Sequence, residues 1–253
     1  MKKLYQFIFL SFIGIMSLVS QPDSSEISIL VLTKTTDYKH EVLPIAIKTL
    51  VELGDSNNWN LTITEDTRLF TPTILLRYDV VIFLMTIGNL FNEQQRMAFM
   101  EFIKSGKGFV GIHTATITET NWPWYEELIG TFFIGHPPEQ QAKLIIEDKS
   151  HPATSFFSEN EWICTDEWYN FISSPHNKVN VLISIDEDSY DVDNNEWFPG
   201  IEQRMGDHPL VWYSEYEGSR IFQTGLGHTL EMYNDKLFKK HLAGAINWAA
   251  FRE

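Results

Sequence analysis

The sequence predicts an α/β protein, a three-layer α/β/α sandwich around a mainly parallel sheet. Short apolar runs alternate with helical segments in the first half of the chain, which is the pattern of βαβ units. One apolar run, at 109–112, leads directly into a small-residue turn with His113 at its apex. Ligands in open α/β sheets bind beyond the carboxyl ends of the strands. His113 is therefore the first candidate for a functional residue.

In the first half of the chain, each helix and strand is predicted from the residues within its own segment. The run 27–32 is apolar and β-branched, as expected for a strand covered on both faces. The segment 41–54 has apolar residues at helical spacing, and Asn92 is a suitable helix cap. The order is close to the flavodoxin-like arrangement. The expected elements are a strand at 27–32, a helix at 41–54, strands at 59–64 and 78–84, a helix from Asn92 to Lys104 and a strand at 109–112.

Beyond residue 130 the alternation weakens and the chain becomes richer in loops. Glu217-Gly218 is a typical hairpin turn between two of the later strands. No repeat, low-complexity tract or linker divides the sequence, so we expect residues 21–253 to form a single domain. The expected elements are strands at 141–147, 180–184, 210–216 and 219–224, and a closing amphipathic helix at 238–251.

Residues 1–20 have the pattern of a bacterial secretory signal peptide. Lys2 and Lys3 precede an apolar run that extends to Val19, and the small residue Ser20 comes before a polar segment. A membrane anchor is the alternative, but the run is shorter than the roughly 20 apolar residues that a bilayer requires. We therefore expect an exported protein, periplasmic or extracellular, with no stable membrane insertion after the signal is removed.

Charge and cysteine content narrow the function further. The formal net charge is −15, and an acidic surface repels nucleic acid, whose phosphates are bound by Lys and Arg. The charge favours a neutral or cationic ligand, although an acidic surface also serves solubility. Cys164 is the only cysteine, so an internal disulfide is impossible. Its apolar neighbours favour a place in the core.

Ionisable residues recur in the loops after the expected strands. Histidine and carboxylate side chains can act there as acid and base near neutral pH, or bind one divalent metal ion, with zinc fitting best. No two histidines have helical i, i+4 spacing, and each motif alone has a structural explanation. The candidate catalytic residues are His113, Asp166, Glu167, His208 and His228, and the candidate metal ligands are His113, His136, His208 and His228.

Large aromatic residues concentrate after residue 120. Aromatic faces beside carboxylates commonly hold sugar rings, because the apolar face of the sugar packs on the aromatic ring while the acids bind hydroxyls. The alternative is that these residues fill the core of a loop-rich region. A small-molecule carbohydrate is thus the expected partner. The candidate substrate-binding residues are Lys34, His40, Trp122, Trp124, Tyr125, Trp168 and Tyr169.

Several segments, in order along nearly the whole chain from Ile27 to Phe251, resemble the ThuA-like family, which is named for a trehalose-utilisation protein. The resemblance implies a class I glutamine-amidotransferase-like fold and a link to disaccharide use, including 3-keto sugars. It does not imply glutaminase activity, because His113 stands near the place of that superfamily's nucleophilic cysteine. The matching segments are 31–35, 38–40, 78–84, 108–113, 122–125, 165–169, 207–209 and 225–228.

Two functions remain open at this point. The first is an enzyme acting on a glycoside or keto-glycoside, with His113 as the central acid/base or metal ligand and Asp166 or Glu167 as its carboxylate partner. His208 and His228 would be further ligands or proton carriers. Adjacent strand residues point to opposite faces, so we expect only one of the two acids to face the cleft. The second function is sugar binding without catalysis. The oligomeric state is not predicted.

Overall fold

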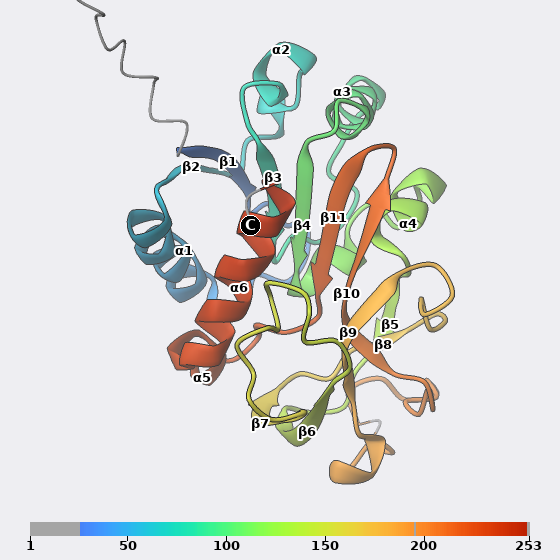
Figure 1. Cartoon of the computed structure of the whole chain (residues 1–253). Coiled ribbons are helices and arrows are strands. Elements are labelled where there is room, and N and C mark those ends of the chain that lie inside the picture. Colours follow the sequence, from blue (N-terminus) through green and yellow to red (C-terminus); the bar gives the residue numbers. More distant parts are fainter. Residues whose placement is uncertain (1–25, 195, 252–253) are drawn as a thin grey trace, which may run out of the picture.

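A central sheet runs through the described part of the chain, residues 26–194 and 196–251 of this computed structural model (Figure 1). Within those residues, nine strands follow one another in the order β2-β1-β3-β4-β11-β10-β9-β6-β7. The first five of these are parallel to one another, and the other four continue the sheet through antiparallel pairs. The predicted α/β fold with a mainly parallel sheet is confirmed.

The strands of the sheet are β1 (Ile27–Leu32), β2 (Trp59–Thr64), β3 (Val80–Leu84), β4 (Gly108–Ile112), β6 (Gln140–Ile146), β7 (Glu161–Asp166), β9 (Asn180–Ile185), β10 (Pro209–Tyr216) and β11 (Ser219–Thr224). Two short strands, β5 (Phe133–Gly135) and β8 (Asn170–Phe171), pair separately. The strands of the first half match the predicted ranges within two residues. The edge strand β7 was not among the predicted elements, because its apolar and polar residues do not alternate strictly.

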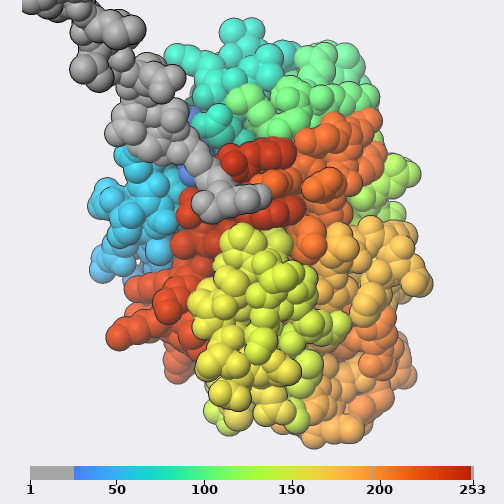
Figure 2. Space-filling model, in the orientation of Figure 1, coloured from blue at the N-terminus to red at the C-terminus, as the bar shows by residue number. Residues whose placement is uncertain are grey.

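Helices cover both faces of the sheet. One face carries α1 (Leu43–Asn57), α5 (Leu230–Asn234) and α6 (Lys236–Ala249); the other carries α2 (Pro72–Leu75), α3 (Glu93–Lys104) and α4 (Pro123–Ile129). Three short 3₁₀ helices, η1 (Thr67–Leu69), η2 (His113–Ile117) and η3 (Glu187–Ser189), complete the described elements. In the space-filling view, α6 lies between α1 and the β10–β11 hairpin (Figure 2).

The central strand β3 shows why the sheet needs a helical layer on each side. Val80, Ile82 and Leu84 belong to the apolar cluster under α1 and α6, whereas Val81 and Phe83 belong to the cluster under α3 and α4. All five side chains are completely buried. Successive strand residues point to opposite faces, so a continuous apolar run is stable only between two layers.

The first helix runs further than its sequence pattern predicts. Gly54 was expected near its end, yet α1 continues to Asn57, and Asn58 takes the left-handed cap conformation with a φ of 58°. Gly54 has another role. A Cβ at this position would lie 2.9 Å from a methyl carbon of Leu61, so glycine allows α1 to pack closely on β2.

The predicted signal peptide, residues 1–20, lies outside the described residues. Among the helices that are described, none combines the length and the hydropathy needed to cross a bilayer.

Candidate active site

Four segments distant in sequence bring His40, His113, Glu167 and His228 together beyond the carboxyl ends of the strands. One ligand atom from each residue lies within 4.8 Å of the other three. His113 directly follows β4, Glu167 directly follows β7, and the other two lie in the loops after β1 and β11. Parallel strands end at one edge of a sheet, which is why these loops meet. We call these four residues the histidine–glutamate cluster.

The backbone turns sharply at His113. Its φ of 57° lies in the left-handed region, a strained conformation that is enriched at functional sites. The ring is fully buried, and Nδ1 lies 3.0 Å from the carbonyl oxygen of Gly225. A carbonyl only accepts, so Nδ1 carries the proton and Nε2 offers its lone pair to the cluster. The hydroxyl of Tyr169 donates to that Nε2 at 2.8 Å.

Glu167 is the anionic centre of the cluster. Its Oε2 lies 3.1 Å from Nδ1 of His228, 3.5 Å from Nε2 of His113 and 3.6 Å from Nε2 of His136. Burial acts to raise the pKa of Glu167, but the interactions with the neighbouring His113 and His228 outweigh it and hold that pKa well below its usual range. The carboxylate therefore stays ionised at neutral pH and attracts positive charge.

Asp166 precedes Glu167 and acts on the backbone instead. Its buried carboxylate accepts hydrogen bonds from the N–H groups of Gly227, His228 and Thr229 at 2.6, 2.9 and 3.0 Å. Burial raises the pKa of Asp166 to about 7, against the opposing effect of these donors. Of the two adjacent acids, Glu167 faces the cluster, while Asp166 fixes the loop that carries His228.

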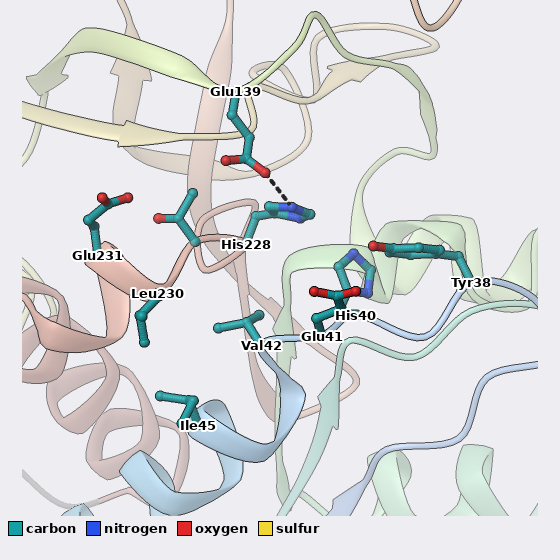
Figure 3. Close-up of a pocket in the computed structure, with 10 residues that line it drawn as sticks. Tyr38, His40, Glu41, Val42, Ile45, Glu139, His228, Leu230 and Glu231 are labelled. Atoms are coloured by element: carbon teal, nitrogen blue, oxygen red, sulfur yellow. Dashed lines mark ion pairs between the residues drawn. The ribbon is translucent and has the colours of Figure 1, made fainter.

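His228 lies between two carboxylates. Its Nδ1 faces Glu167, and its Nε2 lies 2.9 Å from Oε1 of Glu139, which reaches it from the segment just before β6 (Figure 3). Burial acts to lower the pKa of His228, but the neighbouring carboxylates, above all Glu167, outweigh it and raise that pKa. A carboxylate on the outer nitrogen of a histidine is also the usual arrangement behind a metal-binding imidazole.

The other imidazoles of the site, those of His40, His113 and His136, have lowered pKa values and therefore favour the neutral form near pH 7. His40 is 5% exposed, and its Nδ1 has no hydrogen-bond partner among the described residues. Burial, together with the nearby His113 and His228, lowers the pKa of His40 to about 3. Burial also lowers the pKa of His113 and of His136. Neutral imidazoles offer lone pairs that a metal ion or an acidic proton can use.

The cluster could hold one divalent ion, since its four ligand atoms all lie within 4.8 Å of one another. Nε2 of His113 and Nδ1 of His228 are within hydrogen-bonding distance of each other, at 3.2 Å. This spacing is also close to the roughly 3.3 Å between two nitrogen ligands of a tetrahedral ion with bonds of about 2.0–2.1 Å. Three imidazoles and one carboxylate suit zinc. The outer nitrogens of His113 and His228 already have partners in Gly225 and Glu139.

Two open pockets meet at the cluster. We call the first, of about 540 Å³, the aromatic limb, because Phe133, Tyr169, Trp197 and Phe198 line it, and His136 also faces it. Trp197 is 50% exposed, which leaves its ring free to pack against a ligand. The size is that of a small-molecule site.

We call the second pocket, of about 450 Å³, the acidic limb. Three glutamates line it together with apolar side chains (Figure 3). Four residues line both limbs and therefore mark their junction; these are Tyr38, His40, Glu139 and His228.

Three predicted substrate-binding aromatics lie in the core instead. Trp122, Trp124 and Tyr125 pack with the apolar cluster between the sheet and α3, and none is among the described residues that line either limb. Tyr125 is fully buried, and its hydroxyl donates to the carbonyl of Ala115 at 2.9 Å. They begin α4, whose apolar side must face the sheet, so the core-filling alternative holds for these three.

Trp168, Lys34 and His208 also lie outside the two limbs. Trp168 is buried and donates from Nε1 to the carbonyl of Gln140 at 3.0 Å. His208 bridges Oε1 of Glu187 at 2.8 Å and the carbonyl of Tyr169 at 2.9 Å. It therefore holds the segment that carries Tyr169 and is not one of the residues of the cluster.

Sequence reasoning missed Glu139 and Phe198 as site residues, and counted Trp197 only among the aromatic residues that concentrate after residue 120. Glu139 follows two prolines directly before β6, and only the position of that strand brings its carboxylate to His228. Trp197 and Phe198 lie in a long loop with no regular pattern. The only available signal was that this loop is rich in acidic and aromatic residues. Composition does not tell which of these side chains point into the site.

Comparison with known proteins identifies the family of this chain. The family model described as ThuA, trehalose utilisation, matches residues 28–249. The fold and the cluster at its strand ends define an α/β protein with a candidate active site; the chain belongs to the ThuA family. No curated protein matched the sequence.

Solved structures share the fold at low sequence identity. A ThuA-like protein from Bacteroides uniformis superposes with a TM-score of 0.73 and 24% identity, over 91% of this chain and 94% of the other. One from Parabacteroides merdae gives a TM-score of 0.72 and 20% identity, over 89% and 90%. A β-galactosidase from Bacillus circulans gives a TM-score of 0.53 and 12% identity, over 88% of this chain and 31% of that one.

Proposed function

We propose that this protein is a metal-dependent enzyme of carbohydrate metabolism that acts on a glycoside or keto-glycoside. The observation that carries the proposal is the histidine–glutamate cluster at the junction of two pockets. His40, His113, Glu167 and His228 would hold one divalent ion, and zinc suits these donors best. Such an ion polarises a ketone oxygen and stabilises the charge of an enolate.

His136 is the proton acceptor that we propose. Its Nδ1 lies 3.0 Å from the carbonyl oxygen of Pro137, so Nδ1 carries the proton and the Nε2 lone pair faces Glu167 and the aromatic limb. A carbon beside a ketone is acidic enough for an imidazole to deprotonate. The Tyr169 hydroxyl donates to Nε2 of His113, so an ion on that nitrogen would replace this hydrogen bond and leave the hydroxyl to donate to a substrate oxygen.

Acyl transfer through a thiol is not part of the proposal. The single cysteine, Cys164, lies within β7 and lines neither limb. Burial raises the pKa of its thiol, whereas a nucleophilic cysteine needs a lowered pKa. The turn after β4 carries His113, so a thioester route is excluded at that position.

Carbohydrate as the substrate is supported by the aromatic limb, by the net charge of −15 and by the trehalose-utilisation family. The acidic charge disfavours nucleic acid as a partner. We propose export to the periplasm or beyond, on the signal pattern of residues 1–20. Because sugar binding alone also fits an aromatic pocket, the decisive experiment is metal content followed by turnover.

The first test is elemental mass spectrometry on protein purified without chelator. We expect about one zinc or similar ion per chain in the wild type and a loss of most of it in His113→Ala. The matched control is His176→Ala, which removes an exposed histidine that pairs with Asp207. It should keep the metal.

A wild-type protein that contains no metal and binds no added zinc would overturn the metal-dependent mechanism. Saturable binding of disaccharides and 3-keto disaccharides without product, unchanged by a chelator, would instead identify a sugar-binding protein.

A further inference from the structure

We infer that the acidic limb binds the second unit, or aglycone, of the glycoside, and that this unit bears hydroxyls and carries no negative charge. The inference rests on the proposed function, because it assumes that a sugar occupies the aromatic limb. It adds a second binding site, on the other side of the cluster, with its own selectivity.

The arrangement of the two limbs is the first observation. Tyr38, His40, Glu139 and His228 line both limbs, so a ligand longer than one ring that extends from one limb to the other passes over His40 and His228. The bond between its two units would then lie at the cluster. Neither pocket alone offers that placement, which is why we assign the limbs to two units of one substrate.

The side chains of the acidic limb are the second observation. Glu41 and Glu231 are exposed at its rim, and Glu139 lies at the junction. No Lys or Arg is among the described residues that line either limb. Carboxylates accept hydrogen bonds from hydroxyl or ammonium groups, and they repel a carboxylate or phosphate.

The third observation is an apolar surface between these acids. Val42, Ile45 and Leu230 face the same space in Figure 3, and Ile45 and Leu230 are 37% and 54% exposed. His40, whose buried Nδ1 has no partner among the described residues, borders this space as well. A sugar ring has an apolar face and polar edges, so a limb with an apolar wall and acidic rims matches it.

The test uses isoleucine methyl signals as reporters of each limb. Ile45 lies in the acidic limb, while Ile87 and Ile117 lie in the aromatic limb. The metal-loaded protein is titrated near neutral pH with methyl glucoside, glucosamine and glucuronate, and the methyl shifts are followed by NMR. We expect the Ile45 signal to respond to glucosamine most strongly, to methyl glucoside less, and to glucuronate at least about tenfold more weakly than to glucosamine.

A charge-neutralising variant tests the cause of the selectivity. Glu41→Gln/Glu231→Gln should reduce the difference between glucosamine and glucuronate at Ile45 and leave the responses of Ile87 and Ile117 unchanged. The control, Glu93→Gln/Glu101→Gln, removes two exposed acids of α3 and should preserve the selectivity. Both variants alter surface residues only, so folding is checked simply by the dispersion of the spectra.

The outcomes separate this inference from the proposed function. Responses at Ile87 and Ile117 with none at Ile45 would overturn the second site while leaving a sugar in the aromatic limb. Equal response of Ile45 to glucuronate and glucosamine would overturn the charge selectivity. If none of the three methyl signals shifted with any probe, both the second site and the sugar-binding part of the proposed function would be overturned.

Discussion

At the scale of single residues, His228 depends on two acids that lie outside the histidine–glutamate cluster. Glu139 contacts the outer nitrogen of the imidazole, and Asp166 holds the backbone of the loop by three hydrogen bonds. The two acids constrain different degrees of freedom, the rotation of the ring and the position of the main chain. Their replacement should therefore have different consequences.

Glu139→Ala should weaken zinc binding by about 10- to 100-fold, the usual cost of losing an outer partner of a metal-bound histidine. Glu139→Gln keeps an acceptor for Nε2–H of His228 and should recover most of that affinity. Competition with a fluorescent chelator measures the affinity. Glu231→Gln, at the rim of the same pocket, is the control, and an alanine variant with wild-type affinity would contradict the role of Glu139.

Asp166→Asn should lower the free energy of unfolding by about 1–3 kcal/mol, because the amide cannot accept all three backbone N–H donors. Urea denaturation measures the change. Asp207→Asn, at an exposed carboxylate that pairs with Ser174 and His176, should change stability by less than about 1 kcal/mol. Equal effects of the two substitutions would argue against the backbone role of Asp166.

At the scale of elements, the β10–β11 hairpin shows how a turn sets the register of the sheet. Glu217 and Gly218 have φ values of 52° and 88°, so both residues of the turn are left-handed, as in the turns that match the twist of paired strands. A Cβ on Gly218 would meet nothing within 4 Å. A substitution there consequently tests conformation without a steric clash.

Gly218→Ala should destabilise the protein by about 1 kcal/mol, since a left-handed residue with a Cβ costs about that much. Glu217→Asn should act in the opposite direction, because asparagine adopts this conformation more readily than glutamate. Thermal unfolding of the two variants measures both shifts. A stabilising effect of alanine at 218 would contradict the backbone conformation.

At the scale of the whole molecule, stability should depend on pH, because two buried histidines are neutral in the folded protein. Burial lowers the pKa of both His151 and His241 to about 4, from an ordinary value of 6.5. The unfolded chain thus binds more protons than the folded one between those values. The stability due to these two residues is complete above pH 6.5 and is lost as the pH falls toward 4. His40, whose pKa is also lowered, contributes in the same sense. His228 and Asp166, whose pKa values are raised, contribute in the opposite sense.

Lowering the pH from 7.5 to 5.5 should reduce the free energy of unfolding by about 1 kcal/mol for each of His151 and His241. Urea denaturation at both pH values, on the wild type and on variants that remove one titrating histidine, measures the contribution of each residue. His241→Gln removes one of these two titrating groups, so the change in the free energy of unfolding between the two pH values should be smaller by about 1 kcal/mol. His176→Gln, at the surface, should leave that change as it is in the wild type. If the free energy of unfolding of His241→Gln changed with pH as it does in the wild type, the contribution of His241 to the pH dependence would be contradicted.

Much of this fold follows from local patterns. The four parallel strands of the first half, the cap at Asn92 and the turn at Glu217-Gly218 were predictable because alternation, capping and turn chemistry act over a few residues. The turn that presents His113 was predictable for the same reason. The end of α1 was not, because Gly54 serves packing against Leu61 rather than termination.

The sequence by itself determined the fold class, the family and the presence of histidines and acids at the ends of strands. Only the tertiary structure decided which of them meet. It placed His40, His113, Glu167 and His228 together. It showed that Asp166 holds the loop of His228 and that His208 holds the segment of Tyr169. It also placed Trp122 and Trp124 in the core. The physical reason is distance along the chain. Local chemistry shapes each loop, whereas contacts between residues as far apart as 40 and 228 depend on how the strands are ordered in the sheet.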